Sequence, residues 1–191
     1  MAFRQFRDIA VLASAGLSAC TAPFGIAAFE RTLTSNHSAT EALTQWCRVR
    51  GLANPPQIVA QAVKSEMVNP DVAIRRTLAI DASEPVRYRQ VHLLCGDTVL
   101  SIAENWYVPA RLTPEMNRIL DTSDVPFGRA VAPLGYNREQ LSSTRGRAPG
   151  CPEGTVLSVR AVLKLPDGQP ISMVAECYTA ANLGASLAPA R

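Results

Sequence analysis

The sequence is poor in the residues that metal centres and nucleic-acid surfaces require. It contains two histidines, His37 and His92, and neither lies in a cluster with metal-ligand spacing. Aromatic residues make up 6% of the chain, which is too few for a platform on which bases stack. The net charge of +3 comes from scattered basic residues and not from a basic run. These shortages argue against a metalloenzyme and against a nucleic-acid partner.

The chain does have enough apolar material for one folded domain. It is 191 residues long and 47% hydrophobic, which is sufficient for a single core of ordinary size. No internal repeat divides it, and no second domain is evident. The oligomeric state is left open by the sequence.

The first twenty residues have the layout of an export signal. Two arginines precede an apolar run that begins at Ile9, and small residues follow it up to Cys20. The run is too short to span a bilayer. The letters "LSAC" at its end resemble a bacterial lipobox, in which the cysteine is lipidated. We therefore predict a signal peptide over 1–20, lipidation of Cys20, and an exported, periplasmic lipoprotein anchored to a membrane. The alternatives are a cleaved signal peptide without a lipid and an N-terminal helix that contains a cysteine by chance.

Export would place the remaining cysteines in an oxidising compartment, where disulfides form. These four cysteines allow three pairings, and the sequence does not choose among them. We favour Cys47–Cys95, which would tie a helix to the sheet, together with Cys151–Cys177. Four buried free thiols are the alternative.

The pattern of local signals predicts the order of the elements. Residues 21–36 lack sustained periodicity and are expected to form a tether. Ser38 and Glu41 form a capping box that begins a helix, and Gly51 ends it. Strands are expected at 57–63, 85–95 and 98–108, a helix at 112–120, and a closing hairpin at 156–165 and 171–178. This order predicts an α+β fold with an antiparallel sheet covered by helices, in one domain over 37–183, followed by a flexible tail at 184–191.

Strand alternation places charged side chains on faces that are otherwise apolar. Glu176 shares a face with Val174 and Tyr178, while Arg89 shares one with Val91. A buried charge is costly unless it is paired or binds a ligand of opposite charge. Two interpretations follow: a structural Arg–Glu pair at the edge of the sheet, or an internal polar site in which arginine binds a carboxylate and glutamate a hydroxyl or ether oxygen.

Three short motifs, taken in order, resemble the chorismate pyruvate-lyase family. The first is "RQVHLLCGDTVLSIAENWYVP", a strand beginning with Arg89, a turn, and a second strand ending in Val-Pro. The second is the turn "VPFGRAV", which enters a helix at Phe127 and Gly128. The third is the closing hairpin "LKLPDGQPISMVAECYTA", which contains Glu176. Together they cover about half of the chain.

The resemblance implies a six-stranded antiparallel sheet with a closed internal site. It implies elimination of pyruvate from chorismate to give 4-hydroxybenzoate, without a cofactor. Arg89 and the backbone amide of Phe127, beside Gly128, would bind a ligand carboxylate. Glu176 would be the catalytic residue and would donate a hydrogen bond to the ether oxygen. The alternatives are a non-catalytic periplasmic lipoprotein that binds a small aromatic or carboxylated ligand, and a structural lipoprotein.

Overall fold

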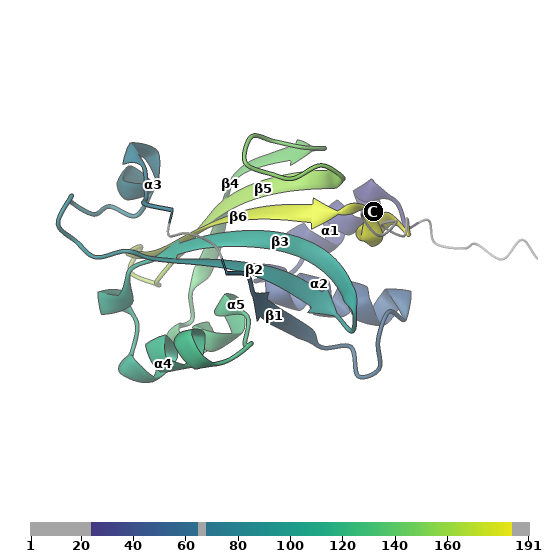
Figure 1. The fold of residues 1–191 in the computed structure, drawn as a ribbon, viewed down its shortest axis with the longest axis horizontal. Coiled ribbons are helices and arrows are strands. Elements are labelled where there is room, and N and C mark those ends of the chain that lie inside the picture. Colours follow the sequence, from purple (N-terminus) through teal and green to yellow (C-terminus); the bar gives the residue numbers. More distant parts are fainter. Residues whose placement is uncertain (1–23, 65–67, 185–191) are drawn as a thin grey trace, which may run out of the picture.

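The computed structural model describes residues 24–64 and 68–184. Its helices are α1 (Ile26–Thr34), α2 (Ala39–Arg50), α3 (Val72–Thr77), α4 (Pro114–Thr122) and α5 (Phe127–Ala130). Its strands are β1 (Ile58–Ala62), β2 (Arg87–Cys95), β3 (Thr98–Tyr107), β4 (Asn137–Arg145), β5 (Thr155–Lys164) and β6 (Pro170–Thr179). The 3-10 turns are η1 (Pro109–Arg111), η2 (Ala132–Leu134) and η3 (Ala180–Leu183). Figure 1 shows the strands side by side in one curved sheet.

The six strands form one antiparallel sheet in the order β1-β2-β3-β6-β5-β4. The hairpins β2–β3 and β5–β6 are consecutive in sequence, and β3 pairs with β6 at the centre. The predicted α+β fold with an antiparallel sheet of six strands is therefore confirmed. In the central register Arg89 lies opposite Asn105, and Asn105 lies opposite Val174, so these three positions form one row across the sheet.

The predicted helix signals act as expected. The Ser38 side chain accepts a hydrogen bond from the backbone N–H of Glu41 at 3.1 Å, which satisfies one free donor at the start of α2. Gly51 ends α2 with φ of 60°, a left-handed conformation that glycine adopts without strain. Thr113 caps α4, whose first residue is Pro114.

One face of the sheet carries two apolar clusters. Beside β1 and β2, α1 and α2 contribute Phe29, Leu43 and Trp46 to the first cluster. Farther along the same face, α4 and α5 contribute Met116 and Phe127 to the second. The opposite face is covered in part by α3, whose Ile74 packs with Trp106 and Met173. Figure 1 shows α2, α4 and α5 on the side of the sheet away from α3.

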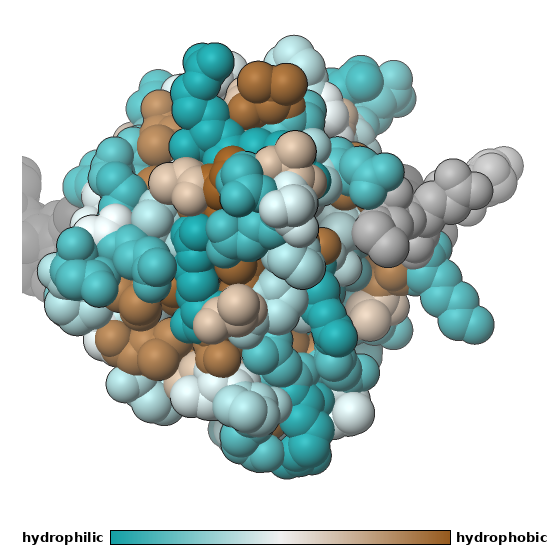
Figure 2. Space-filling view, turned by 90° about the vertical axis from the view of Figure 1, so that its left-hand side faces the viewer, coloured by the Kyte–Doolittle hydropathy of each residue, from teal (hydrophilic) through white to brown (hydrophobic). Residues whose placement is uncertain are grey.

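The end of the molecule that carries α3 and α4 has a mixed surface. Figure 2 shows this end, where hydrophilic side chains separate several hydrophobic patches. Val72 of α3 is an exposed apolar residue of this part of the fold.

Two disulfides join the cysteines in the favoured pairing. Cys47–Cys95 links α2 to the end of β2, so it holds the helix against the sheet as predicted. Cys151–Cys177 links the loop before β5 to β6. Cys177 points to the face opposite Glu176, as the alternation of the strand predicts.

Three segments differ from the sequence-based expectation. The tether predicted at 21–36 is wrong where the structure describes it, because residues 26–34 form α1 and Phe29 is fully buried against Trp46 and Tyr178. A short helix, α3, lies within the segment between β1 and β2, for which no helix was predicted. The predicted signal peptide over 1–20, with Cys20, lies outside the described residues, as does nearly all of the predicted tail.

Candidate functional site

A pocket opens on the sheet face between the two apolar clusters. It encloses about 550 Å³, including the part that is open to solvent. Its lining comes from the start of α2, from the sheet and from the turn into α5: Ser38, Ala39, Thr40, Arg89, Val91, Leu93, Ala103, Asn105, Pro126, Phe127, Gly128, Tyr136, Arg138, Leu163, Val174 and Glu176. Most of the lining is apolar, and the few polar groups converge, which is the usual composition of a small-molecule site.

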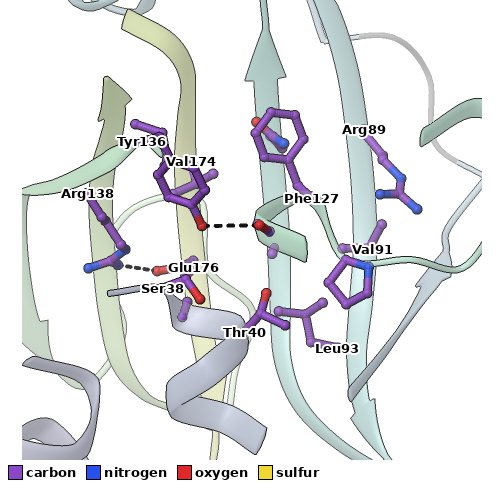
Figure 3. Close-up of a pocket in the computed structure, with 16 residues that line it drawn as sticks. Ser38, Thr40, Arg89, Val91, Leu93, Phe127, Tyr136, Arg138, Val174 and Glu176 are labelled. Atoms are coloured by element: carbon purple, nitrogen blue, oxygen red, sulfur yellow. Dashed lines mark hydrogen bonds and ion pairs between the residues drawn. The ribbon is translucent and has the colours of Figure 1, made fainter. Parts of the chain in front are cut away.

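The pocket is lined by two cations and one carboxylate, namely Arg89, Arg138 and Glu176. Figure 3 shows Arg138 and Glu176 on one side of the pocket and Arg89 on the other. The formal charges of these three side chains sum to +1, so the pocket favours an anionic guest over a cationic one.

Glu176 forms a buried ion pair with Arg138. The Arg138 Nη2 donates to Glu176 Oε2 at 2.6 Å, and the two side chains are 12% and 6% exposed. The Tyr178 hydroxyl donates to the same oxygen at 3.0 Å. The Glu176 carboxylate raises the pKa of Arg138, and burial raises the pKa of Tyr178 well above 10. Glu176 Oε2 therefore accepts two hydrogen bonds, one from Arg138 and one from Tyr178.

Arg89 has a different environment from Arg138. Its Nη1 donates to the backbone carbonyl of Val125 at 3.1 Å, and its Nη2 donates to that of Ser123 at 3.2 Å. Burial lowers the pKa of Arg89. None of the ion pairs formed within residues 24–64 and 68–184 includes Arg89. The Arg89 guanidinium is thus half-buried and donates hydrogen bonds to neutral carbonyl oxygens, while Asp121 and Asp124 stabilise its charge electrostatically without forming an ion pair.

Phe127 and Gly128 form the wall opposite the sheet. The Phe127 ring packs against Tyr107 with ring centroids 5.4 Å apart. A Cβ atom on Gly128 would lie 2.8 Å from the Tyr136 hydroxyl and 3.3 Å from Thr40 Oγ1. The Tyr136 hydroxyl also donates to the Gly128 carbonyl at 3.4 Å, a contact drawn in Figure 3. Glycine is therefore required where this wall approaches Tyr136 and α2.

The structure brings the predicted site residues Arg89, Phe127, Gly128 and Glu176 into one pocket. The further polar residues of the pocket were missed by sequence reasoning, among them Arg138 and Asn105. Arg138 lies on β4, which was not recognised as a strand because its residues are polar on both faces. Asn105 could have been found from alternation in β3, which places it on the face opposite Glu104.

Neither a metal site nor a membrane-spanning helix is found in the part of the chain that the structure describes. No group of three or more His, Cys, Asp or Glu side chains there is arranged to hold a metal ion. Within 24–64 and 68–184, no helix has both the length and the apolar character that crossing a membrane requires.

Comparison with known proteins gives one relative of clear sequence similarity. The uncharacterized protein y4mC of Sinorhizobium fredii is 43% identical over 166 residues, which cover 77% of this chain and 70% of that protein. No protein-family model matches the chain.

Solved structures show the fold at low sequence identity. PhnF from Mycobacterium smegmatis is 14% identical, with a TM-score of 0.54 over 81% of this chain and 69% of that chain. The effector domain of PhnF is 15% identical, with a TM-score of 0.52 over 75% and 88%. YydK from Bacillus subtilis, described as a possible transcriptional regulator, is 16% identical over 70% and 62%, with a TM-score of 0.47, so this chain spans less than two thirds of its length.

These comparisons correct three predictions. Membership of the chorismate pyruvate-lyase family is wrong, although the fold expected from that resemblance is present. The predicted lyase activity and the two lipoprotein alternatives are wrong as well, because a structure that shares this fold is described as an effector domain. The prediction of an exported, periplasmic, membrane-anchored protein is corrected by the same comparison with the PhnF effector domain.

Proposed function

This chain belongs to the family of the uncharacterized protein y4mC of Sinorhizobium fredii, and we propose that it is a binding domain for a small anionic molecule. The molecule occupies the pocket between the two apolar clusters. The observation that carries this proposal is the Arg89 guanidinium, which lines the pocket, is half-buried and forms no ion pair among the described residues. A cation in such a place is stabilised by an anion that enters the pocket.

The anionic group of the ligand is a carboxylate. A guanidinium has five N–H donors, and Arg89 uses two of its nitrogens on the carbonyls of Ser123 and Val125. The remaining donors lie in one plane and match the two oxygens of a carboxylate. In this proposal the backbone amide of Phe127, on the opposite wall, binds the same group.

The body of the ligand is a single apolar ring. The apolar part of the pocket floor between the charged residues includes Val91, Ala103 and Val174, and the Phe127 side chain also lines the pocket. Flat apolar walls beside an aromatic side chain favour a ring, which stacks or packs edge-on against Phe127. The hydrogen bonds that Glu176 accepts from Arg138 and Tyr178 both use Oε2, so its Oε1 is the acceptor that we assign to a ligand hydroxyl.

The similar fold of the PhnF effector domain supports the proposal at the level of architecture only. That domain shares the sheet and helices at 15% identity, so the polar groups of this pocket must be tested in this chain. Arg89 and Phe127 are proposed as ligand-binding residues, and no bond-breaking step is assigned to Glu176.

The test is a matched pair of ligands that differ only in charge. We expect 4-hydroxybenzoate to raise the melting temperature of the purified protein, since a ligand that binds only the folded state stabilises it. The neutral analogue 4-hydroxybenzamide, of the same size, should have little effect at the same concentration. A panel of single-ring carboxylates with and without the hydroxyl extends the comparison. Equal shifts with acid and amide, or no shift with any acid, would refute a carboxylate site at Arg89.

A further inference from the structure

Two buried donors of the pocket have no hydrogen-bond partner in the part of the chain that the structure describes. They are the Asn105 Nδ2 and the Arg138 Nε, both on side chains that line the cavity. Buried donors are almost always paired in folded proteins, because leaving one unpaired forfeits its interaction with water. In a pocket, the missing partner is supplied by whatever molecule enters.

Asn105 is the better defined of the two. It is 5% exposed, and its Oδ1 accepts a hydrogen bond from the Ser172 hydroxyl on the neighbouring strand β6. This contact sets the rotation of the amide group, so that Nδ2 is the end left without a partner. The amide is therefore held in one orientation before any ligand arrives.

The position of Asn105 relates this donor to the proposed carboxylate site. In the β2–β3 register Asn105 is directly opposite Arg89, and on its other side it is opposite Val174. Side chains at opposed positions of adjacent strands share one face of the sheet and lie about 5 Å apart at Cβ. The amide thus lies at the pocket floor, between the Arg89 side and the Arg138–Glu176 side.

We propose that Asn105 is a specificity-determining residue that donates a hydrogen bond from Nδ2 to an acceptor oxygen on the body of the ligand. This inference rests on the proposed function and narrows it: the ligand is a ring carboxylate that also bears an ether, keto or hydroxyl oxygen. A ligand without that oxygen leaves the amide unpaired in the complex and binds more weakly. Ser172 is a positioning residue, since it acts through Asn105.

The test uses pairs of ligands in which one member has an ether oxygen and the other has a methylene group in its place. The ether oxygen can accept a hydrogen bond but cannot donate one. Methoxybenzoates and ethylbenzoates have nearly the same shape, and a methoxy oxygen cannot donate to Glu176. We expect that, at one of the three ring positions, the methoxy acid binds about tenfold more tightly than the ethyl acid, as one buried hydrogen bond implies. In Asn105→Leu that ratio should fall to about one, while binding of the ethyl acid persists.

Two variants keep the result interpretable. Asn105→Leu alone leaves the Ser172 hydroxyl unpaired, so the double variant N105L/S172A removes both partners and is expected to fold. The matched control is Ser101→Ala, which removes another buried polar atom without a partner, on the same strand but outside the pocket lining. S101A should keep the methoxy preference of the unmodified protein.

The outcomes separate the two proposals. If acids bind and depend on Arg89, but the methoxy preference is absent or survives in N105L/S172A, the role of Asn105 is refuted and the carboxylate site stands. If no acid binds, the proposed function fails, and the role of Asn105 fails with it.

Discussion

Replacing Glu176 by glutamine tests whether the charged pair of the pocket is as buried as the structure shows. The Arg138 Nη2 and Glu176 Oε2 atoms are 2.6 Å apart. With an effective dielectric constant of about 20, two unit charges at that distance attract by about 6 kcal/mol. Part of this attraction offsets the loss of hydration of both groups, and removing one partner of a buried pair costs about 3–5 kcal/mol.

We therefore expect Glu176→Gln to lower the free energy of unfolding by about 3–5 kcal/mol. For a domain of this size this corresponds to a melting temperature lower by about 6–20 °C. Urea unfolding with both disulfides intact measures the free energy, and a slope equal to that of the unmodified protein shows that the two unfolding reactions are comparable.

An exposed pair between neighbouring strands provides the control. Lys164 and Glu139, on β5 and β4, are also 2.6 Å apart, but their side chains are 33% and 57% exposed. Glu139→Gln should cost about 1 kcal/mol or less. The double variant R138M/E176M, which leaves no buried charge alone, should regain most of the stability lost in E176Q. A cost in E176Q as small as that in E139Q would refute the buried pair.

The other predictions concern the pocket wall and the response to pH. Gly128→Ala should weaken carboxylate binding at least about tenfold in calorimetric titrations, because a Cβ atom there displaces Tyr136. The double variant G128A/Y136F lacks the obstructing hydroxyl and should restore binding. Unchanged binding in G128A would contradict the close approach of Gly128 to Tyr136. Burial raises the pKa of Tyr178, so its hydroxyl keeps its proton in the folded state, whereas in the unfolded chain it loses the proton near the ordinary value of 10.0. The free energy of unfolding should therefore be unaffected by Tyr178 below pH 10 and decline above it. Urea unfolding of Tyr178→Phe across this pH range should show a smaller decline in the free energy of unfolding. The decline does not vanish, because burial also raises the pKa of Tyr107 and Tyr136. An unchanged dependence of stability on pH in Tyr178→Phe would refute this role for Tyr178.

The sequence predicted those parts of the fold and site that depend on local or two-residue patterns. Ser38 and Gly51 predicted both ends of α2, because capping is decided by a few neighbouring residues. The alternation of side chains along β2 and β6 placed Arg89 and Glu176 on otherwise apolar faces of their strands. In the structure both side chains line the pocket on the sheet face. The favoured disulfides joined elements that a compact domain brings together.

The parts that were missed depend on contacts distant in sequence. A structural Arg–Glu pair was one of the two interpretations of the buried charges, but the arginine that pairs with Glu176 is Arg138. It lies on an edge strand whose exposed residues show no alternation, so neither the strand nor this partner was predicted. The first helix, α1, is short and contributes two buried residues, Phe29 and Leu33, which is too little periodicity to recognise. The function inferred from motif order was wrong because the same sheet and hairpins occur in an effector domain.

The most direct test of the central claim is a calorimetric titration of 4-hydroxybenzoate into three proteins: the unmodified chain, Arg89→Gln and Arg87→Gln. Arg87 lies two residues earlier on the same strand, but its side chain is 50% exposed and pairs with Asp121 outside the pocket. The proposed site predicts that R89Q weakens binding at least about tenfold while R87Q binds as the unmodified protein does. Equal affinities of R89Q and the unmodified chain would contradict a carboxylate site at Arg89.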